Sequence, residues 1–158
     1  MTATIPVARF TTELFALLEE TFDKVGGRYL DRGTSLFETL ATVSAEEASR
    51  PVSARCASIA AQIDHTIFYL EVIGRYIRGT HEGQDDWDAS WQRVYVTPDQ
   101  WAALLDRLHA THQETLALLR GITTWEGEED LGGALNILVH TAYHLGEIRQ
   151  ALCTIKAA

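Results

Sequence analysis

The feature that most restricts the fold of this chain is the spacing of its apolar residues, which recur at alternating intervals of four and three. The C-terminal segment, from about Leu131 to the end, shows this most clearly, with one stripe formed by Ala134, Leu138, Thr141, Leu145, Ile148, Leu152 and Ile155. The pattern is that of an α-helix with one face against a core, and its rhythm is typical of helices in bundles.

The same spacing predicts three further long helices, over residues 10–25, 53–78 and 98–122. Ser53 is the expected N-cap of the second long helix. The third opens on Thr97 as its N-cap, with a proline at the first helical position and a glutamine that closes a capping box. Four long helices therefore account for most of the chain.

Shorter elements are expected in the connections. Ser35 and Ser44 each begin a capping box, which predicts two short helices between the first and second long helices. Trp87 and Trp91 lie in a short helix or irregular arm before the third, and no segment makes a convincing β-sheet. We therefore expect an all-α protein, a four-helix bundle with short extra helices between helices 1 and 2 and before helix 3.

Composition bounds the number of domains and excludes several partners. With 158 residues, 46% of them hydrophobic and 22% charged, the chain fits one globular domain over residues 1–158. The formal net charge of −9 comes without a basic patch, and no apolar run is long enough to span a membrane. We therefore expect neither nucleic acid nor a membrane as a partner.

The cellular location is inferred from the N-terminal segment and the cysteines. Glu13, Glu19 and Glu20 interrupt the first apolar segment, so no signal peptide is recognised there. Cys56 and Cys153 are far apart, and each lies in a helical pattern, which is typical of free thiols in a reducing compartment. We expect a cytoplasmic protein.

Two histidines, His140 and His144, stand four residues apart in the C-terminal helix. Their rings leave the same helix face one turn apart, which is the geometry of a chelating pair. Such a pair cannot fill the coordination sphere of a divalent cation, so a third ligand must come from elsewhere, and His65 is the candidate. The alternative for all three is a structural role in the core. His112, on an inner stripe, is expected to be a buried neutral imidazole.

These residues carry a resemblance to a known family. A histidine in the second long helix, followed by His-Thr-Ala-Tyr-His-Leu-Gly-Glu-Ile-Arg near the C-terminus, resembles the DinB-like superfamily over nearly the whole chain. The resemblance implies a four-helix bundle that binds a divalent metal through His65, His140 and His144. Glu147 is a departure, because many relatives carry glutamine there. Some relatives are S-transferases that use a low-molecular-weight thiol, one branch isomerises maleylpyruvate with mycothiol, and many have no known substrate.

The implied ligand set determines the chemistry that is available. Three neutral imidazoles leave the metal its full charge and an open coordination position, where a water or a thiol loses its proton near neutral pH. Nitrogen ligands suit Zn or Ni, with Fe, Mn and Cu as alternatives. No carboxylate lies between His140 and His144, where H-E-x-x-H enzymes carry their general base. This absence favours thiol transfer over hydrolysis.

Two classes of function remain open. The first is a metal-dependent enzyme with a small-molecule substrate, either a thiol S-transferase or a hydrolase, and the second is a non-catalytic bundle that binds a metal or a small ligand. A homodimer is also expected. The second long helix is apolar almost all round and the chain has four tryptophans, which is more apolar surface than one small bundle needs to bury.

Overall fold

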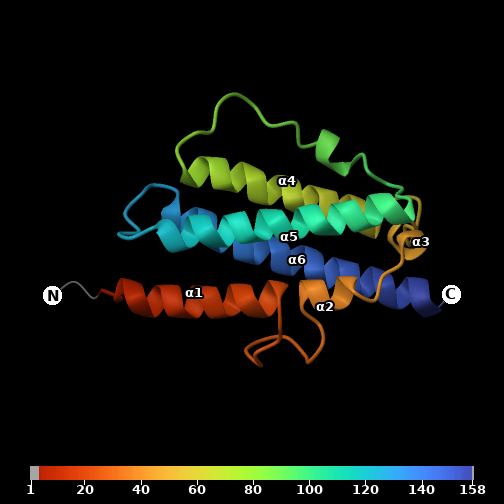
Figure 1. The fold of residues 1–158 in the computed structure, drawn as a ribbon, viewed down its shortest axis with the longest axis horizontal. Coiled ribbons are helices and arrows are strands. Elements are labelled where there is room, and N and C mark those ends of the chain that lie inside the picture. The colour runs from red at the N-terminus through yellow and green to blue at the C-terminus, as the bar shows by residue number, and fades with distance from the viewer. Residues whose placement is uncertain (1–3, 158) are drawn as a thin grey trace.

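The computed structural model describes residues 4–157, and its secondary structure within that range is entirely helical (Figure 1). The four long helices are α1 (Val7–Phe22), α4 (Ile59–Ile77), α5 (Pro98–Gly121) and α6 (Asp130–Ala157). The short elements are α2 (Leu36–Leu40) and α3 (Ala45–Ala48) between α1 and α4, and the 3₁₀ helix η1 (Ala89–Trp91) before α5. The predicted all-α bundle with its short extra helices is confirmed. Over residues 4–157, no helix has the length and apolar character needed to cross a membrane.

Helix α4 is at the centre of the packing. It lies against both α5 and α6, and α1 packs against α6 (Figure 1). The connection over residues 78–97, called the arm below, carries η1 and runs over α4. Ile63 and Ile67 of α4 are completely buried, as are Leu108 of α5 and Leu145 of α6. Leu18 and Phe22 of α1 are buried in the same core, so all four long helices share it. A side chain on the flank of α4 that points toward α6 therefore meets a neighbouring helix.

A glycine sets the close approach of α6 to α4. A Cβ atom on Gly133, in the first turns of α6, would lie 2.7 Å from Cγ1 of Ile77 and 3.3 Å from Cγ2 of Ile73. Real Cβ atoms do not come so near to other atoms, so a side chain here would push the two helices apart. Gly133 thus keeps α6 near α4, two turns before the first histidine of the pair.

The start of α4 differs from the prediction. Its N-cap is Ser58, whose hydroxyl accepts a hydrogen bond from the amide of Ala61 at 3.2 Å and donates one to the carbonyl of Val94 at 2.8 Å. Ser53, the predicted N-cap, instead accepts a hydrogen bond from the amide of Arg55 in a local turn. Residues 52–57 are consequently an irregular segment outside the helix.

The end of α1 also differs from the prediction, because α1 stops at Phe22 and the chain turns back onto Glu20. The buried carboxylate of Glu20 accepts hydrogen bonds of 2.7–3.0 Å from the backbone amides of Gly26, Arg28, Tyr29 and Leu30. Burial alone would raise the pKa of this carboxyl, but the four amides hold the pKa at about 2. The ionised side chain therefore organises the connection that follows α1.

Candidate metal centre

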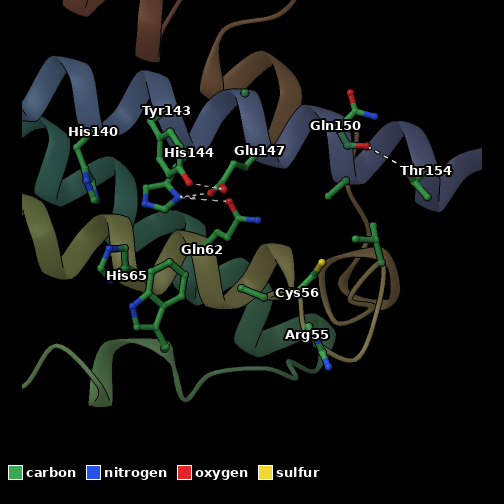
Figure 2. Close-up of a pocket in the computed structure, with 15 residues that line it drawn as sticks. Arg55, Cys56, Gln62, His65, His140, Tyr143, His144, Glu147, Gln150 and Thr154 are labelled. Atoms are coloured by element: carbon green, nitrogen blue, oxygen red, sulfur yellow. Dashed lines mark hydrogen bonds and ion pairs between the residues drawn. The ribbon is translucent and has the colours of Figure 1, made fainter.

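The structure brings the three histidines singled out by the sequence together between α4 and α6. His65 projects from α4, and His140 and His144 project from successive turns of α6 (Figure 2). One ring nitrogen from each residue takes part in a group whose atoms all lie within 4.8 Å of one another. The candidate site therefore lies between two neighbouring helices of the bundle.

The tautomer of His65 follows from its contact with the arm. Its Nδ1 lies 2.8 Å from the hydroxyl oxygen of Ser90, and that hydroxyl donates its proton to the carbonyl of Trp87 at 2.6 Å. Ser90 must then accept from His65, so the proton of the imidazole is on Nδ1 and Nε2 keeps its lone pair. The ring is also stacked on Trp91, with the ring centres 3.8 Å apart.

His144 is oriented by two side chains on its Nδ1 side. This atom lies 3.1 Å from Oε2 of Glu147 and 3.4 Å from Oε1 of Gln62 (Figure 2). Both neighbours are acceptors, so Nδ1 carries the proton and Nε2 again has a free lone pair. The other oxygen of Glu147 accepts a hydrogen bond of 2.7 Å from the hydroxyl of Tyr143. A carboxylate placed in this way fixes the ring and makes it a stronger ligand.

His140 is held by stacking instead of by a hydrogen bond. Its ring lies 3.5 Å from the ring of Tyr69 and is nearly parallel to it. Its Nε2 is buried and has no hydrogen-bond partner among residues 4–157. A buried nitrogen without a partner costs free energy, and a metal ion bound there would satisfy it.

All three imidazoles have lowered pKa values. Burial, together with the charge that His144 and His65 would carry, lowers the pKa of His140 to about 3. Burial and the proximity of His65 lower the pKa of His144 to about 4. Burial also lowers the pKa of His65, although the carboxylate of Glu147 acts in the opposite direction. Neutral rings at pH 7 are the form in which histidine binds metals, so the three residues fit a divalent ion.

A family comparison agrees with this geometry. The sequence model that defines the DinB superfamily matches residues 29–148, which include all three histidines. The chain belongs to the DinB superfamily. No match was found among curated proteins or among solved structures.

In this DinB chain the imidazoles face a cavity of about 820 Å³ between α4, α6 and the irregular segment before α4 (Figure 2). Gln62 and Trp91 line it on the α4 side, and Tyr143 and Glu147 line it on the α6 side. Its far end is lined by residues 52 and 55–57. The candidate site is therefore an elongated cavity with the three histidines at one end.

Sequence reasoning missed several residues around the histidines. Ser90 and Gln62 were not singled out, and both contact a histidine from positions that no local pattern links to it. Asn136, one turn before His140 on α6, is exposed and lies outside the cavity lining. Trp125 packs on Phe10 of α1, away from the cavity lining.

Proposed function

We propose that His65, His140 and His144 bind one divalent metal ion, and that the protein uses it to transfer a low-molecular-weight thiol to an electrophilic small molecule. The observation that carries this proposal is the arrangement of lone pairs. The contacts on Nδ1 of His65 and His144 leave both Nε2 atoms free, and the buried Nε2 of His140 lacks a partner among residues 4–157.

The donor set limits the choice of metal without fixing it. Three imidazole nitrogens suit Zn or Ni, with Fe, Mn and Cu as alternatives. When bound with an open coordination position, such an ion lowers the pKa of a thiol and so supplies a nucleophile near neutral pH. Membership of the DinB superfamily supports a divalent metal at these three residues.

The state of Glu147 supports thiol transfer over hydrolysis. Among residues 4–157 it is the only carboxylate in the lining of the cavity, and both of its oxygens are engaged. One contacts Nδ1 of His144 and the other accepts the hydroxyl proton of Tyr143. A carboxylate tied in this way positions His144 and is poorly placed to activate a water. A metal-dependent hydrolase is the second candidate, because Glu147 nevertheless faces the cavity.

Cobalt substitution tests the proposed function. We expect at least one thiol among bacillithiol, mycothiol, glutathione, cysteine and coenzyme A to add a thiolate charge-transfer band to the spectrum of the cobalt-loaded protein. The same thiol should be consumed when an electrophile is supplied. The matched control is the His144→Ala variant treated with cobalt and the same thiol, and its spectrum should show no such band. If all five thiols leave the spectrum of the wild-type protein unchanged, thiol transfer is wrong, and a hydrolase or a plain binding function moves ahead.

We also propose that the protein forms a homodimer through the outer face of α6. The apolar faces of α4, from which the sequence predicted a dimer, are largely covered by α5, α6 and the arm. On α6, by contrast, Val139 is 65% exposed and Tyr143 is 60% exposed, and Leu131 and Leu135 continue the same stripe. Glu147 is the only charged residue among the exposed positions of α6 from Leu131 to residue 154. Two chains of net charge −9 can approach along such a face with little repulsion.

A charge placed on this face tests the dimer. Light scattering should give the wild-type protein twice the mass of one chain, and Val139→Glu should give the mass of a monomer, because it buries two carboxylates at a two-fold interface. The control Ala103→Glu adds the same charge at an exposed position of α5 and should remain dimeric. A monomeric wild-type protein across the micromolar range would refute the proposal.

The two cysteines support a cytoplasmic location, which we propose as well. Cys56 and Cys153 are both exposed free thiols. Such thiols persist in a reducing compartment and are oxidised readily elsewhere.

A further inference from the structure

We propose that Arg55 binds an anionic group, a carboxylate or a phosphate, of a ligand whose other end lies at the three histidines. The substrate or thiol would then be an elongated molecule with a metal-binding head and a negatively charged tail. This inference rests on the proposed function in one respect, because it places the head of the ligand at the metal.

The length of the cavity supports an elongated ligand. On α6 the lining runs from His140 to Thr154, which are fourteen positions apart. At ~1.5 Å of rise per residue this is about 21 Å along the helix axis. The histidines lie at one end of this span, and Arg55 and Cys56 lie toward the other (Figure 2). A group bound at the histidines alone would leave most of the cavity empty.

The charges in the lining place the anion at Arg55. Among the described residues that line the cavity, Arg55 is the only lysine or arginine and Glu147 is the only aspartate or glutamate. Glu147 is engaged by His144 and Tyr143, so its charge is directed to the protein. The guanidinium of Arg55 makes no hydrogen bond or ion pair within residues 4–157. It is thus an unpaired, solvent-exposed cation at the far edge of the cavity.

The arginines of residues 4–157 divide into two groups. Arg9, Arg32, Arg78 and Arg120 resemble Arg55 in making no side-chain hydrogen bond or ion pair, whereas others are paired. Arg75, Arg93 and Arg107 each bind a carboxylate of the chain. The chain carries 22 acidic residues against 13 basic ones, so carboxylate partners are plentiful. A planar guanidinium matches a carboxylate or a phosphate with two parallel hydrogen bonds, and Arg55 keeps this capacity for a ligand.

The N-terminus of α4 adds positive potential at the same end of the cavity. Ala57 lines the cavity and is followed directly by Ser58, the N-cap of α4. The first turn of this helix contains no acidic side chain that would neutralise its partial positive charge. In a chain with an overall charge of −9, this is a local region where an anionic tail is attracted.

The experiment uses dicarboxylic acid monohydroxamates of increasing chain length. Their hydroxamate head binds open metal sites through oxygen, and their tail is a carboxylate, whereas the matched monomethyl esters have a neutral tail. Affinities are measured by calorimetry on the metal-loaded wild-type protein and on Arg55→Gln, Arg55→Lys and Arg9→Gln. Arg9 is exposed on α1, so its replacement removes the same charge away from the cavity.

At the chain length that spans the cavity, we expect the wild-type protein to bind the carboxylate form about tenfold more tightly than the ester. In Arg55→Gln this ratio should fall to near one, through weaker binding of the carboxylate form and with unchanged affinity for the ester. Arg55→Lys should keep part of the ratio, since it keeps the charge without the planar fork. Arg9→Gln should keep all of it.

Equal affinity of the two forms at every chain length, or a ratio that survives in Arg55→Gln, would overturn the inference. So would a metal-loaded protein that binds neither form. The outcome is separable from that of the cobalt experiment, because hydroxamates do not bind through sulfur. An Arg55-dependent ratio without a thiolate band would overturn thiol transfer alone, and a thiolate band without the ratio would overturn the anion site alone.

Discussion

Replacing any one of His65, His140 and His144 with alanine should abolish stoichiometric metal binding while the protein remains helical. Two imidazoles leave too few protein ligands to compete with buffer for a divalent ion. The histidines are neutral at pH 7, so the loss of one leaves no buried charge that would unfold the bundle. Elemental analysis of the purified variants measures the metal, and circular dichroism measures the helix content.

The control for these variants is His109→Ala, which removes an exposed imidazole from α5 and should keep a full complement of metal. Full metal occupancy in both His140→Ala and His144→Ala would show that the metal binds at another site. Retention in His65→Ala alone would keep the pair on α6 and assign the third ligand to another residue.

The parts of this site that follow from the sequence are those governed by helical periodicity. His140 and His144 share a face because four residues make about one turn, and the apolar stripe of the same helix fixes which flank they occupy. His65 is different, because its assignment as the third ligand rested mainly on the resemblance to the DinB-like superfamily. Sequence spacing permits its contact with α6, but the approach of α4 to α6 at Gly133 belongs to the packing.

The residues that support the histidines come from contacts that no local pattern encodes. Ser90 reaches His65 from the arm, 25 positions away, and Gln62 reaches His144 from 82 positions away. The sequence also did not predict that residues 52 and 55–57 line the cavity, for a different reason. Both Ser53 and Ser58 are good N-caps by type, and the hydrogen bond from Ser58 to the carbonyl of Val94 selects the later one.

His112, which the sequence places on an inner stripe of α5, is expected to make the fold sensitive to acid. It is 1% exposed and stacked on Phe22 at 4.2 Å, and neither of its ring nitrogens has a hydrogen-bond partner within residues 4–157. The carboxylate of Asp23 lies 3.8 Å from Nε2, beyond hydrogen-bond distance. Burial, with smaller effects of His109 and Arg120, lowers the pKa of His112 to about 4.

The sign of the effect follows from the two protonation states. In the unfolded chain the imidazole has its ordinary pKa of 6.5, so between pH 6.5 and about pH 4 the unfolded state binds a proton that the folded state does not. The free energy of unfolding therefore falls as the pH drops through this window. At pH 5 the loss due to this one residue is about 2 kcal/mol relative to pH 7.5, from ~1.4 kcal/mol per pKa unit.

His112→Leu should remove this loss and should also stabilise the protein at pH 7.5, because it replaces two unpaired buried nitrogens with a side chain of similar volume. Urea unfolding of the metal-free protein at pH 7.5 and pH 5 measures both effects, and the absence of metal keeps proton competition at the other histidines out of the comparison. Gln113→Leu, at an exposed position of the same helix, leaves every titratable group in place and should keep the wild-type dependence on pH. If His112→Leu and the wild-type protein lose the same free energy of unfolding between the two pH values, His112 does not cause the acid sensitivity, and its charged form must be accommodated in the fold by Asp23.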